Sequence, residues 1–162
     1  MDREAFAARF GGVFEASPWI AEAAWERRPF GSVESLHAAM VRVVGDATPA
    51  ARLALIRAHP DLAGRAAIAG RLTRESTREQ ASAGLGLDRL APEQYERIRA
   101  LTAAYRERFG FPFIVCAREH TPDSIIAAAA RRLDADPVEE ERTALSEIAK
   151  IARLRLADLV RA

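Results

Sequence analysis

Apolar residues recur at spacings of three and four along most of the chain. Between residues 122 and 133, for example, Ile125, Ala129 and Leu133 keep this spacing, which places them on one face of an α-helix. No stretch alternates apolar and polar residues as a half-buried strand does. The sequence therefore predicts an all-α fold, a helical bundle in a single domain over residues 1–162. The longest predicted helices cover residues 2–10, 33–45, 92–109 and 138–160.

Three further helix starts share one signature, a hydroxyl residue followed by proline. The hydroxyl can accept a hydrogen bond from a first-turn amide, and proline lacks the N–H that would be unsatisfied at that position. We therefore expect a capped helix to begin at each of the pairs Ser17-Pro18, Thr48-Pro49 and Thr121-Pro122.

One segment interrupts the helical pattern, the sequence FGFPFIVCA that begins at Phe109. Gly110 can end the preceding helix in a left-handed conformation, and Pro112 disfavours a helical backbone at Phe111. The sequence thus predicts one buried extended segment near residues 111–117. Its amides and carbonyls are not used within a helix, so they need partners. A planar heterocycle rich in N–H and C=O groups is one candidate, and packing as a hydrophobic connector in the core is the other.

A histidine stands where one of the predicted helices ends. His59 is followed by Pro60, which lacks an N–H and disfavours helical dihedrals at the residue before it. Because imidazole titrates near neutral pH, a histidine held at a helix end is suited to proton transfer. The same residue could simply interact with the last carbonyls of the helix, and the local sequence leaves both interpretations open.

A polar cluster follows the histidine after a short interval. Ser76, Glu79 and Gln80 are three and four residues apart, so on a helix they share one face and could present a hydroxyl, a carboxylate and an amide to a small ligand. The pair Ser76 and Glu79 also fits a capping box.

Arg155 lies between two leucines on the last helix, whose apolar face is broad. An arginine in such a helix usually keeps its charged end in solvent. If its planar fork pointed inward, it could bind a carboxylate or a urea-like carbonyl through two hydrogen bonds.

Composition excludes several classes of protein. The 24 basic and 23 acidic residues interleave without forming a basic stripe, so no nucleic-acid partner is expected. The N-terminus does not resemble a signal peptide, and the longest run of small apolar residues, 125–130, is too short to cross a bilayer. We therefore expect a cytoplasmic protein without membrane association.

The residue types that usually hold cofactors are scarce. Cys116 is the single cysteine, and its apolar neighbours indicate a buried structural thiol. The three histidines show no metal-ligand spacing, so no metal site is expected. The single lysine, Lys150, lies in a charged helix beside Glu147, and the chain has no glycine-rich phosphate-binding motif. The sequence predicts no cofactor.

Three blocks can now be considered together: HPDLAG from His59, ESTREQ from Glu75 and RFGFPF from Arg108. In order and spacing they resemble the OHCU decarboxylase family, enzymes that convert 2-oxo-4-hydroxy-4-carboxy-5-ureidoimidazoline (OHCU) to (S)-allantoin in urate breakdown. The likeness extends from Trp25 to Arg155 and so covers nearly the whole chain.

This resemblance implies an all-α enzyme, a carboxy-lyase without cofactor or metal, whose partner is the small-molecule substrate OHCU and which forms a homodimer in many members. It implies that His59 transfers protons, and we assign Glu79 to orient His59 or to contact the substrate hydroxyl. The residues expected to contact substrate are Pro60, Ser76, Thr77, Arg78, Glu79, Gln80, Phe113, Ile114, Val115, Cys116, Ala117 and Arg155.

Two other classes of function remain as alternatives. In one, the chain is an all-α interaction module whose His-Pro and Phe-Pro segments are purely structural. In the other, it is a hydrolase of a related ureide, in which His59 and Glu79 activate water.

Overall fold

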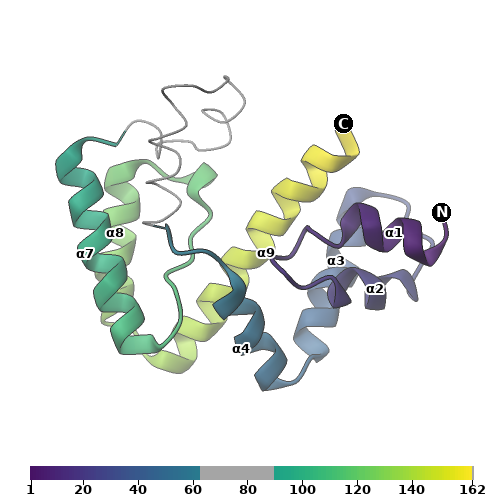
Figure 1. Ribbon diagram of the computed structural model, residues 1–162, viewed down its shortest axis with the longest axis horizontal. Helices are drawn as coiled ribbons and strands as arrows, with labels where there is room; N and C mark the ends of the chain where they lie inside the picture. Colours follow the sequence, from purple (N-terminus) through teal and green to yellow (C-terminus); the bar gives the residue numbers. More distant parts are fainter. Residues whose placement is uncertain (63–89, 162) are drawn as a thin grey trace. The chain divides into compact units, whose positions relative to one another are not determined.

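The computed structural model describes residues 1–62 and 90–161, and these residues form helices joined by loops, without a β-strand among them (Figure 1). The all-α prediction is confirmed. The predicted helix over 92–109 coincides with the observed one, and the other three long predictions agree to within one residue at each end. The helices are α1 (Arg3–Phe10), α2 (Trp19–Trp25), α3 (Val33–Asp46), α4 (Pro49–Ala58), α7 (Pro92–Phe109), α8 (Pro122–Leu133) and α9 (Pro137–Arg161), with a short 3₁₀ turn, η2 (Ala117–Glu119).

The chain divides into two compact units. The first contains Met1–His59 and Leu145–Ala162, and the second contains Pro60–Ala144. Helix α9 therefore contributes its first turns to the second unit and the remainder to the first. The single domain over residues 1–162 stays a prediction.

Two of the three expected hydroxyl caps are present. The Thr48 hydroxyl accepts from the Ala51 amide at 3.1 Å, and the Thr121 hydroxyl accepts from the Ser124 amide at 3.2 Å. The expectation for Ser17 is wrong, because its hydroxyl donates to the Glu15 carbonyl at 2.8 Å instead. Pro18 already has helical dihedrals, and the Ile20 amide donates to the Ser17 carbonyl, so a backbone group takes the place of the hydroxyl.

The core of the first unit is aliphatic with an aromatic edge. Helix α2 packs against both α1 and α3, and the Phe6 and Phe10 rings of α1 lie 4.9 Å apart between centroids. The largest of the side chains that this unit buries completely come from α2, α3, α4 and α9. They are Ile20, Met40, Leu55, Ile56, Ile148 and Leu156.

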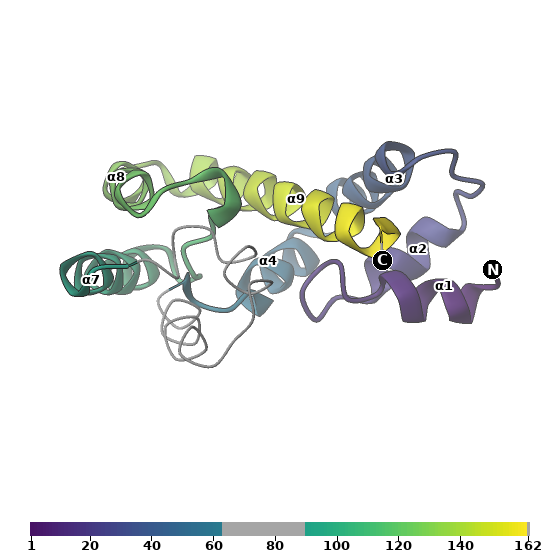
Figure 2. The same ribbon diagram turned by 90° about the horizontal axis from the view of Figure 1, so that it is seen from above.

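In the second unit, α7 and α8 lie side by side in both views (Figures 1 and 2). The Tyr105 ring of α7 contacts three phenylalanine rings, those of Phe109, Phe111 and Phe113, with centroids 4.5 to 5.9 Å away. Its hydroxyl donates to the Glu140 carboxylate at 2.6 Å. Burial, followed by the effect of that carboxylate, raises the pKa of Tyr105 above its ordinary value, so the phenol stays protonated as a donor.

Within the described ranges, no helix is long and apolar enough to cross a membrane.

Gly110 turns the chain from α7 into the extended segment. Its φ of 76° lies in the left-handed region, as the sequence predicted, and its amide donates to the Arg106 carbonyl at 2.8 Å. Only glycine adopts this backbone conformation without steric cost from a Cβ atom. The residue therefore sets the direction in which the extended segment leaves the helix.

We expect Gly110→Ala to lower the free energy of unfolding by about 1–2 kcal/mol, because an L-residue is strained at positive φ. Urea denaturation of the purified protein measures this. Gly45→Ala is the matched control, since Gly45 lies within helix α3 and a Cβ there meets no atom within 4 Å. It should raise the free energy of unfolding by about 0.5–1 kcal/mol, and equal effects of the two substitutions would contradict the assigned role of Gly110.

Candidate active site

His59 ends helix α4 and is almost completely buried, with 5% of its surface exposed. Its backbone is extended, with φ −69° and ψ 138°, as expected for a residue that precedes proline. Its amide donates to the Ile56 carbonyl at 3.2 Å, and its ring Nδ1 lies 3.2 Å from the Leu55 carbonyl oxygen. Two carbonyls of the last helical turn are thus satisfied by this one residue.

The contact with Leu55 determines the tautomer of the His59 ring. A carbonyl oxygen can only accept a hydrogen bond, so Nδ1 carries the hydrogen. In the neutral ring the lone pair is then on Nε2, which is the basic nitrogen. The helix-end contact and the proton-transfer role therefore do not exclude each other, since the first prepares the ring for the second.

The extended segment is buried along its whole length, as predicted, and no residue from Phe111 to Ala117 is more than slightly exposed. Three of its carbonyls accept hydrogen bonds. The Ile114 oxygen accepts from Arg132 Nη1 at 2.7 Å, and the Cys116 and Ala117 oxygens accept from the amides of Glu119 and His120 in the η2 turn.

The amides of the same segment are used differently. In the part of the chain that the structure describes, five N–H groups of the segment have no acceptor, those of Phe111, Phe113, Ile114, Val115 and Ala117. Buried amides are nearly always hydrogen-bonded in folded proteins. These donors are therefore candidates to bind carbonyl or carboxylate oxygens of a ligand.

Arg155 has an arrangement that differs from both sequence interpretations. Its Nη1 lies 2.9 Å from the Glu15 carboxylate and donates to the Val13 carbonyl at 3.2 Å. About a third of its side chain is exposed (32%). The guanidinium is thus neither fully solvated nor pointing into the core. It is partly buried and pairs with a carboxylate of its own unit.

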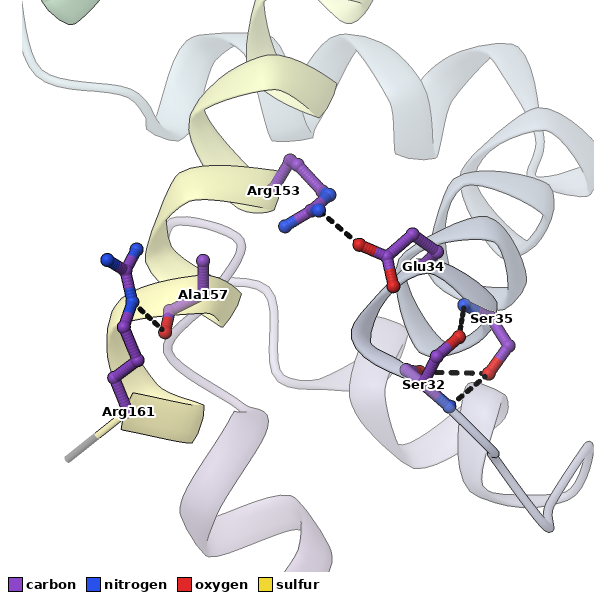
Figure 3. Close-up of polar contacts among 6 residues, drawn as sticks. All are labelled: Ser32, Glu34, Ser35, Arg153, Ala157 and Arg161. Atoms are coloured by element: carbon purple, nitrogen blue, oxygen red, sulfur yellow. Dashed lines mark hydrogen bonds and ion pairs between the residues drawn. The ribbon is translucent and has the colours of Figure 1, made fainter.

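Two neighbouring arginines on α9 have other partners (Figure 3). Arg153 forms an ion pair with Glu34, which lies in the first turn of α3 beside the Ser32 and Ser35 capping box. Arg161 donates from Nε to the Ala157 carbonyl of its own helix at 3.1 Å. Of the three arginines, Arg155 is the one predicted to contact substrate.

The remaining predicted residues are placed as follows. Pro60 is exposed, and Cys116 is buried with 1% of its surface exposed, as expected for a structural thiol. Residues 1–62 and 90–161 contain no group of three His, Cys, Asp or Glu side chains that could hold a metal ion. Ser76, Thr77, Arg78, Glu79 and Gln80 lie outside the described residues.

A buried ion pair that the sequence patterns above do not predict lies beside the extended segment. Arg132 Nε lies 2.5 Å from the Glu140 carboxylate, and the two side chains are only 8% and 2% exposed. The signal was present, because Arg132 follows Ile125, Ala128 and Ala129 at the helical spacing of their buried face.

The first unit also contains an apolar groove of about 280 Å³. It holds none of the predicted site residues and no titratable side chain, so it offers no group for proton transfer. Its lining residues are Phe14, Val41, Val44, Gly45, Leu145, Ser146, Ile148 and Ala149.

Comparisons with known proteins agree on one family. The family model described as OHCU decarboxylase matches residues 1–157. The 2-oxo-4-hydroxy-4-carboxy-5-ureidoimidazoline decarboxylase of Haloferax volcanii is 48% identical over 158 residues, which is 98% of this chain and 90% of that protein.

Solved structures show the same fold. A crystal structure of (S)-allantoin synthase matches with a TM-score of 0.77 and 29% identity, over 98% of this chain and 51% of that one. A crystal structure of OHCU decarboxylase in the presence of (S)-allantoin matches with a TM-score of 0.71 and 20% identity, over the full length of both chains. The fold and the His-Pro helix end thus define an all-α protein of the decarboxylase type. The chain belongs to the OHCU decarboxylase family.

We expect the neutral His59 ring to carry its hydrogen on Nδ1, because the Leu55 carbonyl accepts from that nitrogen. Ring ¹⁵N chemical shifts, measured above the titration range of the imidazole, distinguish the two tautomers. The shift of Nε2 should be that of an unprotonated nitrogen. A protonated Nε2 at the same pH would remove the basis for treating it as the base.

Proposed function

We infer that this chain catalyses the decarboxylation of OHCU to (S)-allantoin in urate breakdown. The observation that carries the inference is the match to this family over residues 1–157, together with relatives of that name such as the one from Haloferax volcanii at 48% identity. The state of His59, a buried imidazole with a defined tautomer, supports the same chemistry.

The substrate supplies its own electron sink. Loss of CO₂ leaves an electron pair on the carbon that carried the carboxylate, and the adjacent ring C=N takes up this pair as an enamine. The hydroxyl on the carbon that carried the carboxylate then loses its proton and becomes a carbonyl. The neighbouring carbon, which belonged to the C=N bond, gains a proton. The protein has to stabilise charge on the ring and to move protons, with the final proton delivered to one face.

In this proposal His59 carries the protons through Nε2, and Glu79 orients His59 or engages the substrate hydroxyl. Ser76, Gln80 and the amides of the extended segment hold the ring and ureido groups. These assignments follow the family resemblance. For the segment they are supported by its amides that have no acceptor among the described residues.

Arg155 balances negative charge on the substrate. A substrate anion has to displace the Glu15 carboxylate or share the guanidinium with it, because Arg155 Nη1 already lies 2.9 Å from that carboxylate. Pro60 and residues 77 and 78 are proposed to contact substrate on the resemblance alone. The homodimer and the cytoplasmic location likewise stay predictions.

The function is tested with freshly generated OHCU, whose decay and product are followed by absorbance and circular dichroism. Wild-type protein should accelerate the decay and yield one allantoin enantiomer, since a proton donor on one side of the planar enamine selects one face. An unchanged decay would favour the interaction module, and a ring-opened product would favour the hydrolase.

His59→Asn should lower kcat by about 10² to 10⁴, the range usual for a general acid-base residue. The asparagine amide can still donate to the Leu55 carbonyl, so the helix end should persist. His37→Gln is the matched control, because His37 Nε2 lies 2.7 Å from the Ala149 carbonyl and a glutamine amide can replace it there. Turnover near wild type in folded His59→Asn would remove His59 from the mechanism.

Arg155→Lys should raise KM about tenfold, because lysine keeps the charge but loses the planar fork that binds a carboxylate through two hydrogen bonds. Steady-state kinetics measure the change. The control is Arg153→Lys. Arg153 lies two residues before Arg155 on α9, pairs with Glu34 and is not assigned to substrate (Figure 3). Equal KM values for the two variants would assign Arg155 to stability alone.

A further inference from the structure

Arg132 joins three elements of the second unit to the extended segment. From helix α8 its Nε donates to the Glu140 carboxylate of α9, and the same carboxylate accepts from the Tyr105 hydroxyl of α7. Its Nη1 donates to the Ile114 carbonyl at 2.7 Å, and its guanidinium lies over the Phe113 ring at 4.5 Å. The guanidinium is therefore held by two hydrogen bonds and by two rings, because it also lies 5.8 Å from the centroid of the Tyr105 ring.

This arrangement determines the orientation of one peptide group. Ile114 and Val115 are joined by a trans peptide bond, in which the carbonyl and the following N–H point in opposite directions. Since the Ile114 carbonyl points to Arg132, the Val115 N–H points away from it. The Val115 amide is one of the segment's five that have no acceptor among the described residues, and it is the one whose direction the bond to Arg132 sets.

The hydrogen-bond network around Arg132 leaves one buried donor without a partner. Only 7% of the surface of Arg132 is exposed, yet its Nη2 has no hydrogen-bond partner within the described part of the chain. A buried charge pair is seldom the most stable filling of a core, and an unsatisfied donor makes it less so. Arg132 therefore keeps the Ile114 carbonyl in a fixed direction, although its own Nη2 is left without a hydrogen bond within the described residues.

We propose that Arg132 is a positioning residue for the decarboxylation: by holding the Ile114 carbonyl it directs the Val115 N–H toward an oxygen of the substrate that gains negative charge in the reaction. The proposal rests on the proposed function. Arg132 does not touch the substrate in this role; it acts through the peptide group. A misdirected amide would weaken stabilisation of the transition state more than binding of the ground state.

The test uses the full-length protein and the variant Arg132→Lys, which keeps a positive charge beside Glu140 but lacks the fork that reaches both acceptors. We expect kcat to fall about tenfold or more with a smaller change in KM, and the enantiomeric excess of allantoin to fall with it. Arg108→Lys is the matched control. Arg108 donates to the Ala135 carbonyl at 2.8 Å and lies over the Phe109 ring in the same unit, without a bond to the segment.

Tyr105→Phe separates stability from positioning. It removes the hydrogen bond to Glu140 but leaves the bond between Arg132 and Ile114, so it should lower the melting temperature while kcat and enantiomeric excess stay at wild-type values. If Tyr105→Phe and Arg132→Lys lose the same activity at matched stability, Arg132 is structural and the proposal fails.

A measurement on wild-type protein covers the case in which Arg132→Lys does not fold. Titration of ¹⁵N-labelled protein with (S)-allantoin should shift the Val115 amide proton downfield, whereas an unperturbed Val115 amide would overturn the proposal. Wild-type kcat and enantiomeric excess in Arg132→Lys would also overturn it. A wild-type protein that does not accelerate OHCU decay would instead refute the proposed function, and the proposal with it.

Discussion

The buried ion pair between Arg132 and Glu140 is the constraint on which the second unit depends. Two charges removed from water need close partners, and here each charge has them: Glu140 accepts from both Arg132 and Tyr105, and Arg132 also donates to the Ile114 carbonyl. Because these groups come from three helices and the extended segment, none of those elements can shift without breaking a charged hydrogen bond. The Tyr105 phenol is protonated at neutral pH even with its ordinary pKa, and burial and the Glu140 carboxylate raise that pKa further.

The first unit shows how one contact can serve both structure and chemistry. The end of helix α4 leaves carbonyls without intrahelical partners, and His59 satisfies two of them. The ring contact also decides which nitrogen is basic. The local backbone therefore defines the reactive state of the residue to which the family resemblance assigns proton transfer.

The arginines of helix α9 show how little a sequence position says about a charged side chain. Arg153 pairs with a carboxylate of α3 and Arg155 with a carboxylate after α1, whereas Arg161 contacts the Ala157 carbonyl and the Asp158 carboxylate of its own helix. The partners of Arg153 and Arg155 are distant in the sequence and are brought near only by folding, so the spacing of the arginines does not predict them. Arg155 was open to two interpretations from sequence, and the structure shows a third arrangement.

The sequence by itself determined the features that depend on neighbouring residues. These are the helices with their 3.6-residue period, the threonine caps, the left-handed turn at Gly110, the extended backbone of His59 before proline and the buried segment of residues 111–117. Tertiary structure alone decided the rest. It buried Arg132 and Glu140 as a pair, and it brought the Glu15 carboxylate to Arg155. Local rules follow from the sterics and hydrogen bonding of adjacent residues, whereas the partner of a buried charge depends on groups that only the packed helices bring together.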